Sequence, residues 1–325
     1  MTIILEEQGI DNAIQKQFGY FIKRFKINKL LREVGAAKEK GVSVYVMFSF
    51  LLSLVFTRKN LYETMALSRT PPSFSKNAVY RFLSRRSINW EAFIKKLSVK
   101  VIPEVDKLTS EERKTVLILD DTPFWRDRSK KVEMLSRCYD HSEKKYYKGF
   151  TMMNLGWSDG QTFVPVDFRL LASGNDKNLL EGSHIEEDGR TLATKRRAEA
   201  RKDKPSLSLR MLEDAKGTSA QTKYVLFDSW FASPSFMLSV KGLGYDCIAR
   251  LKNHENYRYL YNGEALSISK IHQMNKKRRG RSRYLLSVMV EIRHKDFEDT
   301  VPAKIVYVRD RVNRKNWIAL ISTDI

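Results

Sequence analysis

Two apolar segments of the sequence each run directly into aspartate. Residues 116–119 (VLIL) are followed by Asp120 and Asp121, and residues 224–227 (YVLF) are followed by Asp228. Continuous apolar runs of this length predict strands that are buried on both faces. Carboxylates at the ends of neighbouring strands would face the crevice where α/β sheets bind ligands, and together they could share divalent cations such as Mg2+. For either segment alone, an aspartate that forms a turn or caps a helix is the alternative.

The charge of the chain indicates which substrate such a site would meet. Lysine and arginine number 59 against 38 aspartates and glutamates, which gives a formal net charge of +21. A surface this basic favours a polyanion, because neutralising phosphates releases counterions. Two metal ions can activate water or a 3′-hydroxyl and stabilise the leaving oxygen in phosphoryl transfer. We therefore expect a metal-dependent nuclease or strand transferase; a basic protein without a nucleic-acid partner is the alternative.

Other chemistries lack their sequence patterns. The five histidines show no paired spacing for zinc, and no phosphate-binding loop of the type Gly-x-x-x-x-Gly-Lys-Ser/Thr occurs. The two cysteines, Cys138 and Cys247, cannot form a disulfide framework and indicate a reducing compartment, and Cys247 lies in an apolar segment typical of a core. Residues 43–56 are apolar but too short to span a membrane, so we expect a buried helix there, and no signal peptide is recognised.

The elements that would position the aspartates change character near residue 110. Before that point, apolar side chains recur at helical spacing, and residues 75–83 resemble a short capped helix that carries Arg81, with Arg85 just beyond. That basic helix could contact DNA or be the solvated face of a small bundle. After that point, we expect strands at 116–119, 150–157, 162–171, 224–227 and 245–251, and three more at 284–292, 303–308 and 317–322. The alternation with predicted helices indicates an α/β fold.

Two basic segments are candidates for DNA contact. The more basic one lies just before the last three predicted strands, and we expect it to follow a phosphate backbone rather than to form a solvated loop; its cations are Lys276, Lys277, Arg278, Arg279, Arg281 and Arg283. The other forms part of a predicted exposed helix and contains Lys195, Arg196 and Arg197. For this second segment, ion pairs with Glu199 and Asp203 are an equal alternative.

Two tryptophans follow the aspartate motifs closely. Trp125 and Trp230 could each stack on an extruded base, but core packing is the interpretation we favour for both.

Several motifs in order carry a resemblance to a known family. Residues 119–122 (LDDT), 139–141 (YDH), 148–150 (KGF) and 226–231 (LFDSWF) resemble those of DDE transposases of bacterial insertion sequences, in particular the insertion-sequence-four family. The similarity extends from about Tyr80 to the end of the sequence. It implies a ribonuclease H-like mixed sheet with helices, preceded by an α-helical DNA-binding region and carrying a β-rich insertion.

The resemblance also implies roles for particular residues. The family's Asp-Thr motif falls on Asp121 and Thr122, which makes Asp121 the first metal ligand with Asp120 as the fallback, and the second ligand falls on Asp228. The implied chemistry is nicking at element ends followed by attack of the freed 3′-hydroxyl, with two Mg2+ ions that Mn2+ could replace. The implied partners are double-stranded DNA, as terminal repeats and as target, and a second copy of the chain when assembled on DNA. The expected location is the bacterial cytoplasm, at the nucleoid when DNA is bound, with no membrane association.

The sequence departs from the family at the third acid. That glutamate belongs to a motif of the form Tyr-x-x-Arg-Trp-x-Ile-Glu, which no segment matches, and the sequence ends near the point where the linker to that motif would begin. Asp324 is a poor substitute because it follows a predicted strand. We therefore expect a C-terminally truncated chain, either a fragment or the product of a broken gene, with an incomplete site and weak or absent catalysis.

We predict three parts: a helical DNA-binding region over 1–110, the first part of the catalytic core over 111–252, and the β-rich insertion over 253–325. The predicted function is DNA transposition. One rival is a catalytically incomplete DNA-binding remnant that occupies element ends, and another is a nuclease unrelated to transposition.

Overall fold

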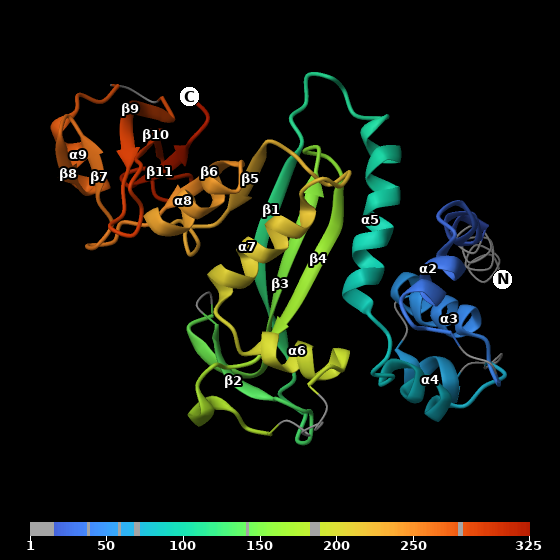
Figure 1. Ribbon diagram of the computed structural model, residues 1–325. Coiled ribbons are helices and arrows are strands. Elements are labelled where there is room, and N and C mark those ends of the chain that lie inside the picture. The colour runs from blue at the N-terminus through green and yellow to red at the C-terminus, as the bar shows by residue number, and fades with distance from the viewer. Residues whose placement is uncertain are drawn as a thin grey trace, which may run out of the picture. The chain divides into compact units, whose positions relative to one another are not determined.

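The chain divides into two compact units. The computed structural model describes residues 16–37, 40–57, 60–67, 72–140, 143–182, 189–278 and 282–325. One unit comprises Met1–Val101 with Glu186–Arg196, and the other comprises Ile102–Ile185 with Arg197–Ile325 (Figure 1). Each unit is described separately below, and the predicted boundaries near residues 110 and 252 stay predictions.

The first unit is helical in its described part. Residues 16–24 form a helix, and further along lie α2 (Ile27–Glu33), α3 (Val44–Thr57), the π-helical turn η1 (Glu63–Leu67), α4 (Lys76–Leu83) and α5 (Trp90–Asp106), whose last turn belongs to the second unit. Apolar side chains from all of the α-helices form one core, in which Ile27, Met47 and Val79 are almost fully buried. The side chain of Ser75 caps α4 by accepting a hydrogen bond from the N–H of Ala78, as the sequence predicted.

Helix α3 is less buried than its composition predicted. We expected a buried helix over residues 43–56, but Met47 is the one fully buried side chain of its described part. Val46, Val55 and Phe56 are exposed by 42%, 71% and 53%. The prediction of burial was therefore wrong for much of this helix, because only one of its faces packs on the core. None of the described helices is both long and apolar enough to cross a membrane.

The second unit is built on a mixed sheet. Its elements are β1 (Val116–Trp125), β2 (Ser136–Asp140), β3 (Lys145–Ser158), β4 (Phe163–Leu171), η2 (Asp176–Asn178), α6 (Leu192–Ala200), α7 (Lys204–Ala215), β5 (Tyr224–Phe227), α8 (Pro234–Gly242), β6 (Asp246–Leu251), β7 (Tyr259–Tyr261), β8 (Glu264–Leu266), α9 (Ile268–Met274), β9 (Tyr284–Ile292), β10 (Val301–Arg309) and β11 (Trp317–Ser322). The part of α6 up to Arg196 belongs to the first unit. The strand order is β2-β3-β1-β5-β6-β11-β10-β9-β7-β8, and β4 pairs with β3 beside β2.

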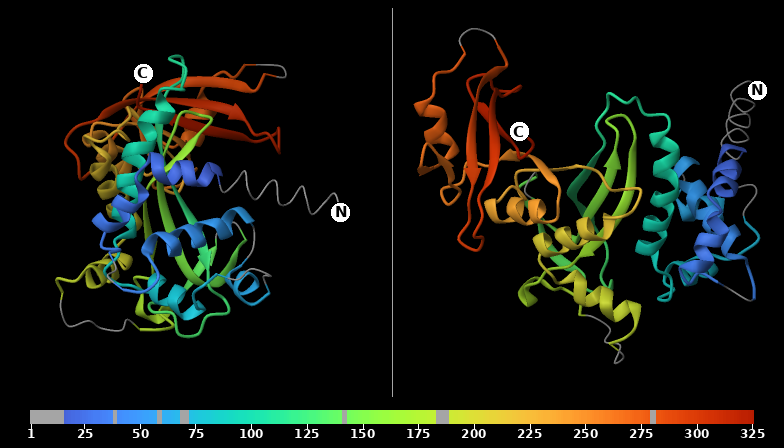
Figure 2. Two further views of the ribbon diagram at one scale, coloured as in Figure 1. Left: turned by 90° about the vertical axis from the view of Figure 1, so that its right-hand side faces the viewer. Right: turned by 45° about the horizontal axis from the view of Figure 1, so that its top comes forward.

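The pairing around β1 is that of a ribonuclease H-like core. Strands β3 and β4 extend antiparallel from β1 on one side, and β5 and β6 run parallel to it on the other. Figure 2 shows β3 and β4 as long strands lying side by side. Helix α7, which connects β4 with β5 after α6, packs on β3 and on α8, and α8 packs on β6. The predicted fold class is confirmed.

The β-rich insertion extends the same sheet. Strand β11 pairs antiparallel with β6, and β10, β9 and β7 continue outward from it (Figure 1). Tyr259 and Tyr307 are nearly fully buried in this part, and the hydroxyl of Tyr307 donates a hydrogen bond to the carbonyl of Ile268. The insertion and the core are therefore joined by backbone hydrogen bonds.

Candidate active site

The two aspartate motifs emerge side by side from parallel strands. Strands β1 and β5 pair in parallel register, ending with Leu119 opposite Phe227. The next residues are Asp120 on β1 and Asp228 beyond β5, so both leave the parallel ladder at the same edge of the sheet. We predicted that β1 would end at this point, but it continues to Trp125 because β3 pairs with it antiparallel along its whole length. Asp120 and Asp121 thus lie within a strand.

Asp120 and Asp121 project to opposite faces of β1, since successive side chains of a strand alternate. Partial burial raises the pKa of the Asp120 carboxyl, and the negative charges of Asp121 and Asp228 raise it further, against the lowering effect of the Asp121 N–H. That N–H donates to Asp120 Oδ1 at 2.9 Å. The negative charge of Asp228 thus acts on the Asp120 carboxyl, and a bound divalent cation would offset that repulsion.

Asp121 is held by a cation from α7. Lys204 Nζ lies 2.7 Å from Asp121 Oδ2, and both side chains are largely buried, with exposures of 24% and 22%. The same ammonium lies 4.6 Å from the centroid of the Trp230 ring. The backbone N–H of Trp230 in turn donates to Asp228 Oδ1 at 2.9 Å. Lys204 thus contacts both the β1 motif and the turn that follows β5.

The chemistry of the donors fits hard divalent cations. Carboxylate oxygens from one or two side chains, completed by water and phosphate, are the usual environment of Mg2+ in proteins. Asp121 and Asp228, with Asp120 beside them, are the residues that would hold such ions. Within the described ranges, however, no group of three or more histidine, cysteine, aspartate or glutamate side chains converges closely enough to hold a metal ion.

Asp324 lies at the other end of β5. Its carboxylate pairs with Lys223 Nζ at 2.6 Å and accepts a hydrogen bond from the Tyr224 hydroxyl at 2.7 Å. Tyr224 is the first residue of β5 and Asp228 follows its last, a separation of about 13 Å at the rise of a strand. Asp324 therefore does not join the other carboxylates.

The tryptophans beside the motifs are half-exposed, contrary to the core packing that we favoured. Trp125 and Trp230 are each 41% exposed. Trp125 stacks on Tyr147 with ring centroids 5.8 Å apart, and Lys145 Nζ lies 4.6 Å from its centroid. Each ring therefore presents a face or edge to solvent near a cation. Cys247 is fully buried, as predicted.

The most basic segment precedes β9. Lys276, Arg278 and Arg283 are exposed, whereas Lys277 is partly buried and its ammonium donates to a backbone carbonyl. The guanidinium of Arg278 lies 4.7 Å from the centroid of the Tyr284 ring. Arg279 and Arg281 lie outside the described residues.

The second basic segment is mostly engaged within the protein. Arg197 forms a two-point ion pair with Glu133, in which Nε lies 2.5 Å and Nη2 3.0 Å from the carboxylate oxygens. Arg196 donates to the carbonyl of Ile88 and to the side chain of Asn89. Lys195 is exposed. Of these three predicted contacts, only Lys195 is exposed; the predicted exposed helix is therefore half-buried, with no fully buried residue.

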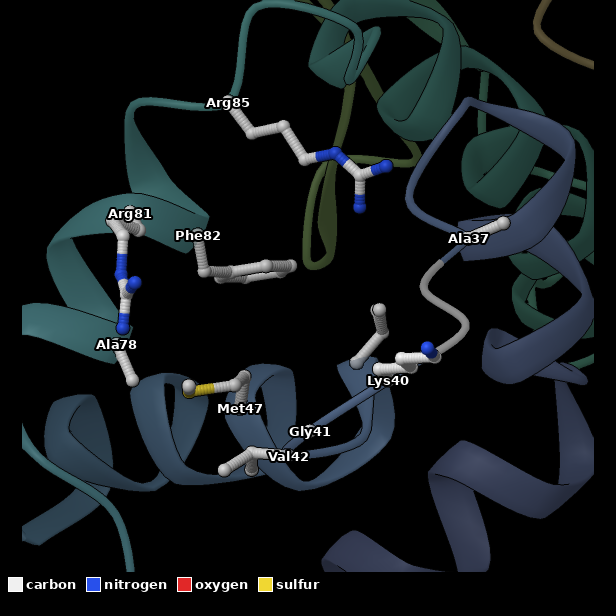
Figure 3. A pocket seen from close by; sticks show the side chains of 10 residues that line it. Ala37, Lys40, Gly41, Val42, Met47, Ala78, Arg81, Phe82 and Arg85 are labelled. Carbon is white, nitrogen blue, oxygen red and sulfur yellow. The ribbon is translucent and has the colours of Figure 1, made fainter.

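The basic residues of the helical unit line a pocket. Arg81 and Arg85, with Lys40, surround a cavity of about 840 Å3 whose apolar lining includes Met47 and Phe82 (Figure 3). Arg81 lies on α4, and Arg85 follows the end of that helix. The two arginines predicted for DNA contact are therefore brought to one pocket.

Lys204 is the site residue that the sequence did not reveal. The sequence did contain a signal for its role. Lys204 stands immediately before Pro205 and is the first residue of a helix. Acidic residues are favoured at that position, so a lysine there indicates a partner elsewhere in the fold. Its partner Asp121 is 83 residues away in sequence, so the pair depends on the fold.

The comparison with family profiles agrees with this geometry. The profile of a family described as DDE superfamily endonuclease matches residues 52–315. No curated protein matches the sequence.

Proposed function

The chain belongs to the DDE superfamily endonucleases, and on that premise we propose that it is a DNA transposase of the insertion-sequence-four type. The observation that supports this proposal is the parallel register of β1 and β5, which sets Asp120 and Asp121 beside Asp228 at one sheet edge. Endonucleases of this superfamily act on DNA, and the net charge of +21 suits that substrate.

We propose that Asp121 and Asp228 hold divalent cations, with Asp120 as the alternative first ligand. Bound Mg2+ would supply activation of water or a 3′-hydroxyl and stabilisation of the leaving oxygen. The protein's own part is to fix the carboxylates on paired strands, with the Trp230 N–H orienting Asp228. Nicking at element ends followed by strand transfer is the proposed sequence of steps.

DNA would be held by the exposed cations of both units. We propose that Lys276, Arg278 and Arg283 contact the phosphate backbone, as do Arg81 and Arg85 in the helical unit. The roles of Lys195, Lys277, Arg279 and Arg281 stay proposals of the same kind, whereas Arg196 and Arg197 are engaged by internal partners. We further propose that two copies assemble on DNA, in the cytoplasm at the nucleoid.

Isothermal titration calorimetry with Mg2+ tests the metal site by binding alone. The test therefore applies whether or not catalysis requires a further carboxylate. Asp228→Asn should weaken Mg2+ binding at least about tenfold, because a carboxylate ligand is lost. Asp121→Asn and Asp120→Asn distinguish the two possible first ligands, since the true ligand should match the loss seen for Asp228→Asn. Asp299→Asn, an exposed carboxylate on a loop before β10, is the matched control. Equal Mg2+ affinity in Asp228→Asn and Asp299→Asn would remove Asp228 from the site.

A DNA-binding remnant is the second candidate function, favoured by the lack of a third converging carboxylate within the described ranges. Nicking of a supercoiled plasmid in Mg2+ separates the two. In a chain extended by the family's glutamate motif, the transposase proposal expects nicking that Asp228→Asn abolishes while DNA affinity is kept. A DNA-binding remnant would bind DNA without nicking it, with or without that substitution.

A further inference from the structure

Lys204 occupies a position that local electrostatics disfavour. It is the first residue of α7, where unpaired backbone N–H groups carry partial positive charge and repel a cation. The preceding Asp203 caps the helix by accepting a hydrogen bond from the N–H of Ser206 at 2.9 Å. That carboxylate serves the helix end, so the contacts that hold the Lys204 ammonium lie elsewhere.

Those contacts belong to the carboxylate site. The ammonium lies 2.7 Å from Asp121 Oδ2 and 4.6 Å from the centroid of the Trp230 ring, and the Trp230 N–H is bonded to Asp228. The lysine side chain is 24% exposed, so its charge is only partly screened by water. The ammonium is therefore paired with a carboxylate that a metal ion would also need.

We propose that Lys204 is the resident counter-ion of this site, which a divalent cation must displace from Asp121. The inference rests on the proposed metal-binding function and deepens it. An Asp121 oxygen that accepts the ammonium at 2.7 Å is not available to a cation in the same direction. Positive charge at this place also repels an incoming Mg2+. Metal binding through Asp121 Oδ2 and the Lys204–Asp121 contact are therefore mutually exclusive.

Two roles for Lys204 predict opposite effects on Mg2+ affinity when the ammonium is removed: competition with the metal for Asp121, or orientation of Asp121 for the metal. If Lys204 competes, Lys204→Met frees Asp121 and should tighten Mg2+ binding about threefold to tenfold, because a partly exposed ion pair no longer has to be broken and a repulsive charge is gone. If Lys204 only orients Asp121, the same change should loosen the carboxylate and weaken Mg2+ binding. Lys204→Arg keeps the charge and can hold both carboxylate oxygens, so it should weaken Mg2+ binding about threefold.

The experiment is a calorimetric Mg2+ titration of the full chain and its variants at low ionic strength. Lys216→Met is the matched control, because Lys216 caps the opposite end of α7 and its loss removes the same charge from the protein. Mg2+ affinity should rank Lys204→Met above the unmodified chain and Lys204→Arg below it, with Lys216→Met unchanged.

Two results overturn the inference. One is equal or weaker Mg2+ binding by Lys204→Met, provided its unfolding temperature shows that it is folded. The other is that Lys204→Arg binds Mg2+ at least as tightly as the unmodified chain. This second result decides the question if Lys204→Met does not fold. Asp228→Asn in the same series tells failure of this inference from failure of the proposed function. If the proposed metal site is wrong, Asp228→Asn binds Mg2+ as well as the unmodified chain does. If only the role of Lys204 is wrong, Asp228→Asn still binds Mg2+ more weakly.

Discussion

Arg197 is predicted to stabilise the fold rather than to bind DNA, and replacing it with methionine tests this. The Arg197 side chain is 13% exposed and its guanidinium makes two bonds to Glu133, whose side chain is 30% exposed. Hydrogen bonds to charged groups contribute about 1.5–3 kcal/mol, and a buried carboxylate left without its partner costs more. Because water reaches Glu133 in part, we expect Arg197→Met to lower the free energy of unfolding by about 2 kcal/mol.

Urea denaturation measures that loss, and fluorescence anisotropy with a labelled duplex measures DNA affinity on the same preparations. Arg197→Met should keep DNA affinity within about twofold once folded, because its charge already faces Glu133. Lys195→Met is the control from the same helix. Because Lys195 is exposed, this substitution should change the free energy of unfolding by less than about 0.5 kcal/mol. Unchanged stability of Arg197→Met with a tenfold loss of DNA affinity would refute the reasoning.

Three further outcomes are expected. A hydrogen bond from the N–H of Thr162, together with other hydrogen bonds, lowers the pKa of the Asp159 carboxyl to about 2 from 3.8. The charged carboxylate therefore contributes its full stabilisation of the fold above pH 4, and this contribution is lost as the pH falls through 2. Asp159→Asn should therefore destabilise by about 2 kcal/mol at pH 7 and by much less near pH 2, as urea titrations at both values would show; an equal loss at both would contradict this. Gly149→Ala should cost about 3 kcal/mol in unfolding experiments, because its Cβ would lie 2.1 Å from the carbonyl oxygen of Phe124 at a φ of +155°; a loss below 1 kcal/mol would exclude that clash. Lys276→Ala should reduce the slope of log affinity for DNA against log salt by about one; an unchanged slope would place Lys276 off the phosphate backbone.

The sheet was predictable where burial alone decides structure. The apolar runs at 116–119 and 224–227 are neighbouring parallel strands, as predicted. Their predicted burial on both faces was only partly right, because alternate residues of each run are buried and the others are partly exposed. The end of β1 was not predictable in this way. Residues 120–125 are polar or half-exposed and stay in the strand because β3 supplies backbone partners as far as Gly149. Long-range pairing there extends a strand beyond its hydrophobic signal.

Charged contacts were the least predictable part of the site. Arg197 and Glu133 are 64 residues apart in sequence, and Lys204 and Asp121 are 83 apart. A run of cations looks the same in sequence whether its charges meet phosphate or internal carboxylates, because only the tertiary fold decides which partners are near. The two aspartate motifs could be found because each directly follows an apolar run, and the two runs pair as parallel strands.

The pairing of β6 with β11 brings the two ends of the insertion together. Leu251, the last residue of β6, lies opposite Ala319 in β11, so the chain departs from the core sheet and rejoins it at adjacent points. A short reverse turn could bridge those points and leave the β6–β11 ladder intact. The segment between them can thus vary in length without shifting β5, the strand that Asp228 follows. The geometry separates a replaceable β-rich module from the sheet framework that holds the aspartates in register.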